Sequence, residues 1–151
     1  MKNMKINILF LLFFASFLLQ AQENYDKLKI KDMHVRKWEY IVEKVKLTSQ
    51  DAEKAQPIFM EYEQAVWKLM EKNRPFFMAN KNKENTKTNF KEINDRYINI
   101  EIQKAHLLKS YYQKLEKVVS DEIIFKMGNA ERSFRKDLVK DWQGKHNHKR
   151  K

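Results

Sequence analysis

Side chains that could bind a metal are few in this sequence and lie far apart. The chain has 4 histidines. His146 and His148 are two residues apart and can weakly hold a transition metal, but no further ligand near them completes a site. His34 falls on an apolar helical face, where a packed core histidine is the simpler interpretation. His106 falls opposite the apolar stripe of its own expected helix and faces solvent. We therefore predict no metal site, with these four histidines as weak candidate ligands.

The motifs of the common enzyme classes are absent from the sequence. The chain has 2 glycines, too few for a glycine-rich phosphate loop, and it has no cysteine for a disulfide, a thiolate metal site or a lipid anchor. It contains no HExxH motif and no recognisable cluster of Ser, His and an acid. Its many carboxylates are spaced mostly as i,i+4 partners of Lys or Arg on helices. We therefore predict that the protein is not an enzyme and needs no cofactor.

The first 21 residues have the features of an export signal. Lys2 and Lys5 precede an apolar stretch over residues 6–19, and Ala21 supplies a small residue at the expected cleavage point. This stretch is shorter than the roughly 20 apolar residues of a spanning helix, so cleavage is favoured over an uncleaved anchor. We therefore predict a signal peptide over residues 1–21 and a soluble periplasmic protein after cleavage.

The chain is strongly basic. Lys and Arg number 31 against 20 Asp and Glu, a net charge of +11 that falls to +9 without the two lysines of the leader. Nucleic acid is not an expected partner for an exported protein. Anionic lipid headgroups, acidic polymers or acidic protein segments are the alternatives that this charge leaves open.

Helices should dominate the mature chain, because 2 Gly and 2 Pro are too few for the turns of a β-rich or α/β domain. Leu47 precedes Thr48, which can cap a helix, and Asp51 follows at the capping-box position. Ser120 can cap another helix in the same way. Apolar residues recurring every three to four positions predict four helices in one domain over residues 22–142. Their expected ranges are about 26–46, 49–80, 90–119 and 121–142, with a polar connector over 79–89 and a disordered basic tail over 143–151.

Two sets of side chains fall outside the expected core stripes. Met60 and Trp67 project from the second helix, either as core contacts with another helix or as an adaptable exposed ridge. On the last helix, apolar and basic side chains share the face opposite the core. They pack in a dimer or form a basic, apolar binding surface. These residues are Phe125, Arg132, Lys136 and Val139.

Five short segments together form a recognisable pattern. They are Leu47-Thr48-x-x-Asp51-Ala52, Pro57-Ile58-Phe59-x-x-Tyr62, Tyr111-Tyr112-x-x-Leu115, Val119-Ser120-x-x-Ile123 and Ala130-Glu131-Arg132-Ser133-Phe134-Arg135. They resemble the Spy/CpxP-like periplasmic proteins, which carry two Leu-Thr-x-x-Gln motifs, and in particular a branch labelled as sensors associated with extracytoplasmic-function sigma factors. The first motif here has Asp51 in place of Gln, and the second lacks both Leu-Thr and Gln, although the capping chemistry is retained.

The resemblance implies an all-α fold, a long bent antiparallel hairpin of about four helices that forms a cradle-shaped homodimer. It implies ATP-independent holding of unfolded envelope proteins. From the residues themselves we expect the surface that binds unfolded or acidic envelope proteins to consist of Met60, Trp67, Phe125, Arg132, Lys136 and Val139. Two alternatives stay open. One is a metal or stress sensor that binds a membrane-bound regulator in a sigma-factor pathway, and the other is a protein that binds anionic lipid surfaces through its net charge.

Overall fold

The computed structural model describes residues 30–80 and 89–147, with side chains described up to residue 140. The predicted signal peptide lies outside these residues, as does His148 at the end of the chain. The chain divides into two compact units, Met1–Lys37 and Trp38–Lys151, and the boundary falls inside the first helix. The packing described below belongs to the second unit.

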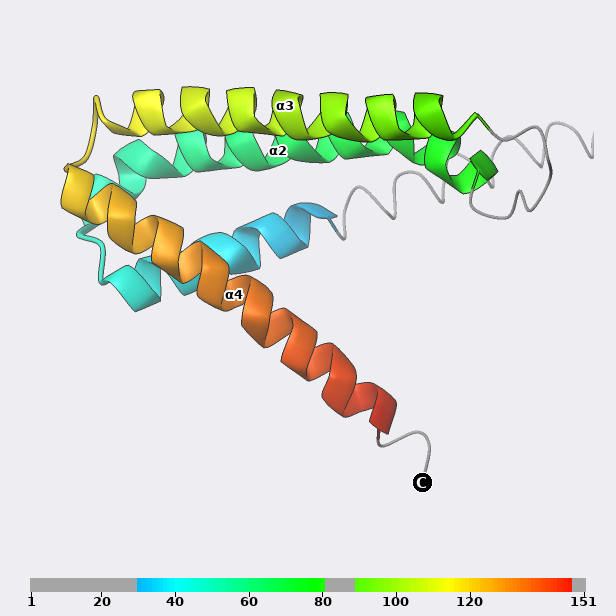
Figure 1. Ribbon diagram of the computed structural model, residues 1–151. Helices are drawn as coiled ribbons and strands as arrows, with labels where there is room; N and C mark the ends of the chain where they lie inside the picture. Colours follow the sequence, from blue (N-terminus) through cyan, green and yellow to red (C-terminus); the bar gives the residue numbers. More distant parts are fainter. Residues whose placement is uncertain (1–29, 81–88, 148–151) are drawn as a thin grey trace, which may run out of the picture. The chain divides into compact units, whose positions relative to one another are not determined.

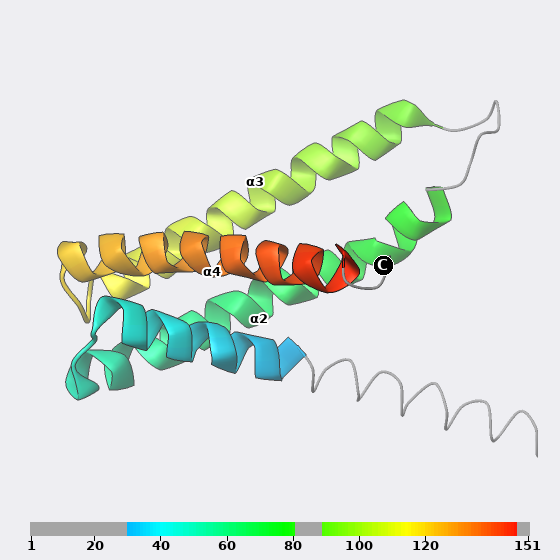
Figure 2. The ribbon, with the colours of Figure 1, turned by 90° about the horizontal axis from the view of Figure 1, so that it is seen from below.

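The fold is all-α, which confirms the prediction from the sequence. A first helix covers residues 30–45 of the described chain. It is followed by α2 (Ser49–Asn80), α3 (Phe90–Leu115) and α4 (Asp121–Asn147). The described segments contain no strand. Figure 1 shows α2 and α3 running side by side in opposite directions, and the view in Figure 2 agrees.

The first helix ends in a left-handed residue that closes its last turn. Lys46 has a φ of 57° and is not a glycine. Its amide donates to the carbonyl of Glu43 at 3.3 Å, and the amide of Leu47 donates to the carbonyl of Val42 at 3.1 Å. This pair of bonds is a Schellman motif, which satisfies helix carbonyls that have no partner further along the helix. The chain can therefore reverse direction within the few residues before α2.

α2 begins at the cap that the sequence suggests. The amide of Asp51 donates to Thr48 Oγ1 at 3.1 Å, and the Thr48 hydroxyl donates to Asp51 Oδ2 at 2.7 Å. α2 then continues through Pro57 and Pro75 to Asn80. Pro57 is exposed, so its ring lies on the outer side of the helix, away from the buried Phe59.

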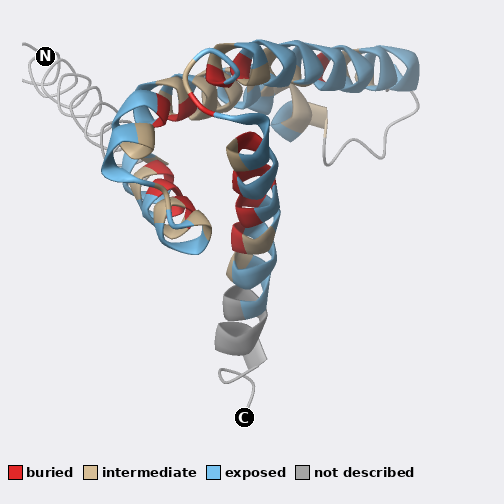
Figure 3. Cartoon of the chain, turned by 90° about the vertical axis from the view of Figure 1, so that its left-hand side faces the viewer, coloured by how far each residue is buried: buried red, intermediate tan, exposed pale blue. Residues whose placement is uncertain are grey.

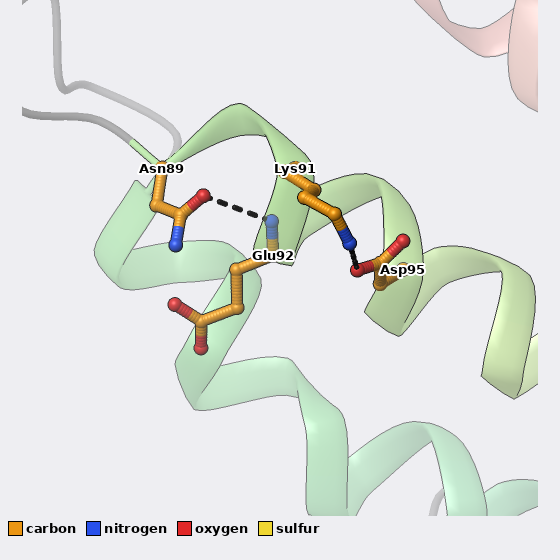
Figure 4. A network of polar contacts seen from close by, with 4 residues as sticks. All are labelled: Asn89, Lys91, Glu92 and Asp95. Carbon is orange, nitrogen blue, oxygen red and sulfur yellow. Dashed lines mark hydrogen bonds and ion pairs between the residues drawn. The ribbon is translucent and has the colours of Figure 1, made fainter.

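α3 has a cap of its own, which the sequence analysis did not name. The amide of Glu92 donates to Asn89 Oδ1 at 3.1 Å (Figure 4), which makes Asn89 the N-cap residue. Lys91 also pairs with Asp95 one turn later, as the same figure shows. α3 ends at Leu115, four residues before the expected end, because the chain turns there. The amides of Val118 and Val119 both donate to the carbonyl of Leu115, at 2.9 and 3.0 Å.

The core lies where the first helix, the first turns of α2, the end of α3 and the start of α4 meet. Trp38 contacts Phe59 with ring centroids 5.2 Å apart, and Tyr40 meets Phe134 edge-on at 5.4 Å. Figure 3 shows the buried residues of α4 along one side of that helix. The buried cluster consists of Trp38, Ile41, Ala55, Phe59, Tyr111, Leu115, Val119, Ile124, Met127 and Ala130.

The other half of the α2–α3 hairpin buries little. No residue of α3 before Ile100 is buried, and no residue of α2 after Phe59 is buried. Two helices alone have no third layer to cover their remaining apolar faces. Large apolar side chains are consequently exposed there, at Met70, Met78, Phe90, Tyr97, Ile98 and Ile102.

Candidate binding surface

α4 carries its candidate residues on the side away from the core. Phe125 and Val139 are 67% and 54% exposed, and Arg132 and Lys136 are exposed between them. Met127, Ala130 and Phe134 occupy the buried side. The outer residues are spaced by seven, four and three positions, which places them on one helical face. We call Phe125, Arg132, Lys136 and Val139 the outer face of α4.

The end of this face near the α3–α4 turn is hollowed. Phe125 and Arg132 line a hollow of about 240 Å³ together with Tyr112 of α3. Gly128 forms part of its wall, and a Cβ atom there would lie 3.0 Å from Tyr112 Oη. The missing side chain of Gly128 therefore makes room for the Tyr112 hydroxyl against α4.

The hollow and the rest of the outer face differ in charge. Glu116 and Asp121 line the hollow with Arg132, whose Nη2 donates to Asn129 Oδ1 at 2.6 Å. Lys136, one turn further along α4, does not line it. The hollow is therefore mixed in charge, and the basic character of the outer face lies from Arg132 toward Lys136.

The two candidate residues of α2 lie elsewhere. Met60 is half-buried and packs against the core cluster, while Trp67 is half-buried further along the helix. Neither lines the hollow beside Phe125. The structure thus groups four of the six candidate residues on α4 and places Met60 mainly in a core contact, which is the first of the two alternatives that the sequence left open.

The described histidines do not gather into a site. His34 is buried and His106 is exposed on α3. Among the side chains that the structure describes, in residues 30–80 and 89–140, no group of three or more His, Cys, Asp or Glu is placed to hold a metal ion. The side chain of His146 lies outside the described part.

A buried polar contact joins α3 and α4 inside the core. Tyr111 Oη donates to Glu131 Oε1 at 3.4 Å, and both residues are less than a tenth exposed. Tyr111 also stacks on Tyr62 of α2, with ring centroids 4.4 Å apart and an angle of 7° between the rings. Sequence reasoning did not single out Glu131 as a core residue. The available signal was its position four residues after Met127, on the edge of the buried stripe.

Burial and negative charge act on the pKa values of these tyrosines in the same direction. Loss of water around Tyr62 raises its pKa to about 12, and the charges of Glu131 and Glu63 add to the rise. Burial is also the main cause of a raised pKa for Tyr111, with Glu131 contributing through charge and through the hydrogen bond. The raised pKa values extend the pH range over which both phenols stay neutral in the folded protein, where they serve as packing groups with one polar end.

Comparison with known proteins adds no relative. Models of protein families, curated proteins and solved structures all give no match to this chain. The resemblance to Spy/CpxP-like proteins therefore depends on the short motifs alone. No helix in the described residues is long and apolar enough to cross a membrane.

Proposed function

We propose that this protein is a non-enzymatic, ATP-independent chaperone of the Spy/CpxP type, which holds unfolded or acidic envelope proteins in the periplasm. The proposal requires export by the predicted signal peptide. It also requires a surface that binds many sequences without a fixed pose. The observation that supports it best is the outer face of α4.

That face combines exposed apolar and basic side chains opposite a packed core. Phe125 and Val139 are more than half exposed, although a solvated helix face has no need of them. Arg132 and Lys136 lie between them and have no carboxylate partner among the described residues. The basic charge favours early encounter with an acidic client, and the separate apolar contacts hold it afterwards.

The α2–α3 hairpin supports the homodimer that the resemblance implies. Its exposed apolar side chains include Phe90 at 70% and Ile98 at 56% exposed. These side chains lie on the half of the hairpin that is two helices thick, where no described segment of the same chain covers them. We infer that a second copy of the chain covers part of this surface.

The test is suppression of the aggregation of a chemically denatured model protein, measured by light scattering without nucleotide. The unmodified protein should reduce scattering in proportion to its concentration. Arg132→Glu/Lys136→Glu should lose most of this protection, because the outer face then repels acidic segments of the client.

The matched control reverses two other exposed lysines, in Lys54→Glu/Lys117→Glu, which gives the same net charge. Neither lysine belongs to the outer face of α4. This control should protect nearly as well as the unmodified protein, while circular dichroism checks that both variants remain helical. Equal protection by all three proteins would show that the outer face of α4 does not bind clients.

A further inference from the structure

A second hollow lies between α2 and α3, away from the outer face of α4. It has a volume of about 480 Å³, which falls in the range of roughly 300–1,000 Å³ for small-molecule sites. Ala65, Leu69 and Leu107 give it an apolar floor, and each of the three is half-buried. Because two helices alone form its walls, it is an open groove and not an enclosed cavity.

The rim of this groove has one sign of charge. Lys68 and Lys72 of α2 and His106 of α3 line it and are exposed, and no carboxylate lines it. Lys68 and Lys72 are one helical turn apart, on the same side of α2 as Leu69. No carboxylate of the described residues pairs with either lysine, although other lysines of the chain do form such pairs, for example Lys114 with Glu61 at 2.6 Å.

A neighbouring hollow of the same hairpin shows that this charge is local. It has a similar volume of about 430 Å³ and shares Leu69 and Lys72 with the groove, but Glu92, Asp95 and Arg96 also line it. Acidic and basic groups are therefore mixed there. Of these two hollows, the groove with Lys68 and His106 has an apolar floor and a rim with basic but no acidic side chains.

From this arrangement we propose that the groove binds a small amphipathic anion, with an apolar body the size of a short alkyl chain or a fused ring and one anionic head group. The body lies on Leu69 and Leu107, where it removes apolar surface from water. The head group lies beside Lys68 and Lys72, whose exposed ammonium groups attract it, and His106 lies on the same rim. This proposal does not depend on the chaperone function, since the groove shares no residue with the outer face of α4.

The first experiment uses the unmodified protein and varies only the charge of the ligand. The anionic dye 8-anilinonaphthalene-1-sulfonate is bound to the protein and then displaced by decanoate, decanol or decyltrimethylammonium, each below its micelle-forming concentration. Decanoate should displace the dye at a concentration about fivefold lower than decanol does, because weak ion pairs of this kind add modest affinity. The difference between decanoate and decanol should shrink at high salt, and decyltrimethylammonium should be the weakest competitor. 1-Naphthoate is a further competitor, which shows whether an aromatic body binds in place of an alkyl one.

The second experiment locates the site. Lys68→Gln/Lys72→Gln should weaken decanoate binding roughly fivefold while leaving decanol unchanged. Lys54→Gln/Lys117→Gln removes the same charge from residues that line neither hollow of the hairpin, and it should bind like the unmodified protein.

Three results would overturn the proposal. Decanol could displace the dye as well as decanoate does. Lys54→Gln/Lys117→Gln could lose as much affinity for decanoate as Lys68→Gln/Lys72→Gln loses. An acidic peptide could bind at the groove although neither decanoate nor 1-naphthoate does. The comparison of head groups needs no substitution, so it decides the question even if a variant is poorly folded.

Discussion

Gly128 sets how closely the Tyr112 hydroxyl approaches α4. The position of a Cβ atom on Gly128 lies 3.0 Å from Tyr112 Oη and 3.7 Å from Arg132 Nη1. A contact of 3.0 Å is shorter than side chains normally make, so an alanine here would displace the tyrosine ring. The two residues together shape the hollow at the end of the outer face.

We predict an energetic coupling between Gly128 and Tyr112. Gly128→Ala should stabilise the Tyr112→Phe protein by about 0.5–1 kcal/mol, because alanine favours the helix and the clashing oxygen is gone. In the unmodified protein the same substitution should gain less, or should destabilise. Urea unfolding of the unmodified protein, the two single variants and the double variant measures the difference. If the two changes in the free energy of unfolding are additive, the contact between Gly128 and Tyr112 is not tight.

Tyr62 makes the stability of the fold sensitive to alkaline pH. Its pKa is raised from 10 to about 12 in the folded protein, so between these values the unfolded chain ionises and the folded chain does not. The stabilisation is fully present below pH 10 and is lost as the pH rises toward 12. We expect the fall in melting temperature from about pH 9 to about pH 11 to be smaller in Tyr62→Phe. Lysine titration is common to both proteins, so an equal fall in melting temperature would contradict the assignment of this pH dependence to Tyr62.

At the scale of elements, helix ends explain where the chain turns. Thr48 and Asn89 cap α2 and α3 through their side chains, and Ser120 stands before α4 with a longer contact of 3.4 Å to the amide of Ile123. The first helix has a left-handed residue at its end instead. Lys46 adopts this conformation at a cost, because its Cβ crowds the backbone where glycine has none.

Replacing Lys46 by glycine should therefore stabilise the protein. The φ of 57° is one that glycine adopts without strain, and the gain should be about 0.5–1 kcal/mol after the greater freedom of the unfolded chain is subtracted. Thermal or urea unfolding measures it. Lys46→Ala is the control, which removes the lysine side chain but keeps the Cβ. A glycine variant no more stable than the alanine variant would mean that this position carries no strain.

The helices were predictable from the sequence, but their mutual contacts were not. Thr48 with Asp51 and the apolar spacing from Ala55 to Phe59 predicted the start of α2, and the helix ends at Asn80 as expected. Periodicity also placed Phe125 and Val139 on the outer side of α4, where they are exposed. Periodicity does not say which residues of two helices face each other. The contact of Glu131 with Tyr111 and the approach of Tyr112 to Gly128 therefore required the structure.

Met60 packs against the core cluster, which agrees with the core contact that the sequence offered beside an exposed ridge. The end of the last helix differs from the expected one. α4 continues to Asn147, past the expected end at residue 142. No proline follows residue 142 in the sequence, and Gly144 does not end the helix.

At the scale of the whole molecule, the half of the α2–α3 hairpin far from the core is the part that we infer a second copy covers. Ile98 and Ile102 lie one turn apart on α3 and are 56% and 49% exposed. Neighbouring exposed apolar residues on a two-helix hairpin favour association. We predict that sedimentation gives twice the chain mass at micromolar concentration. Ile98→Asp/Ile102→Asp should shift the protein to monomer without loss of helix, and a monomeric unmodified protein would contradict the inferred dimer.

The central claim is that the outer face of α4 contacts unfolded clients, and photo-crosslinking tests it most directly. A photoreactive side chain is placed at Val139, or at Lys54 as a control on α2, and each protein is irradiated with a denatured client in the absence of nucleotide. The account predicts abundant crosslinks to the client from position 139 and few from position 54. Equal yields from the two positions, or none from position 139, would contradict it.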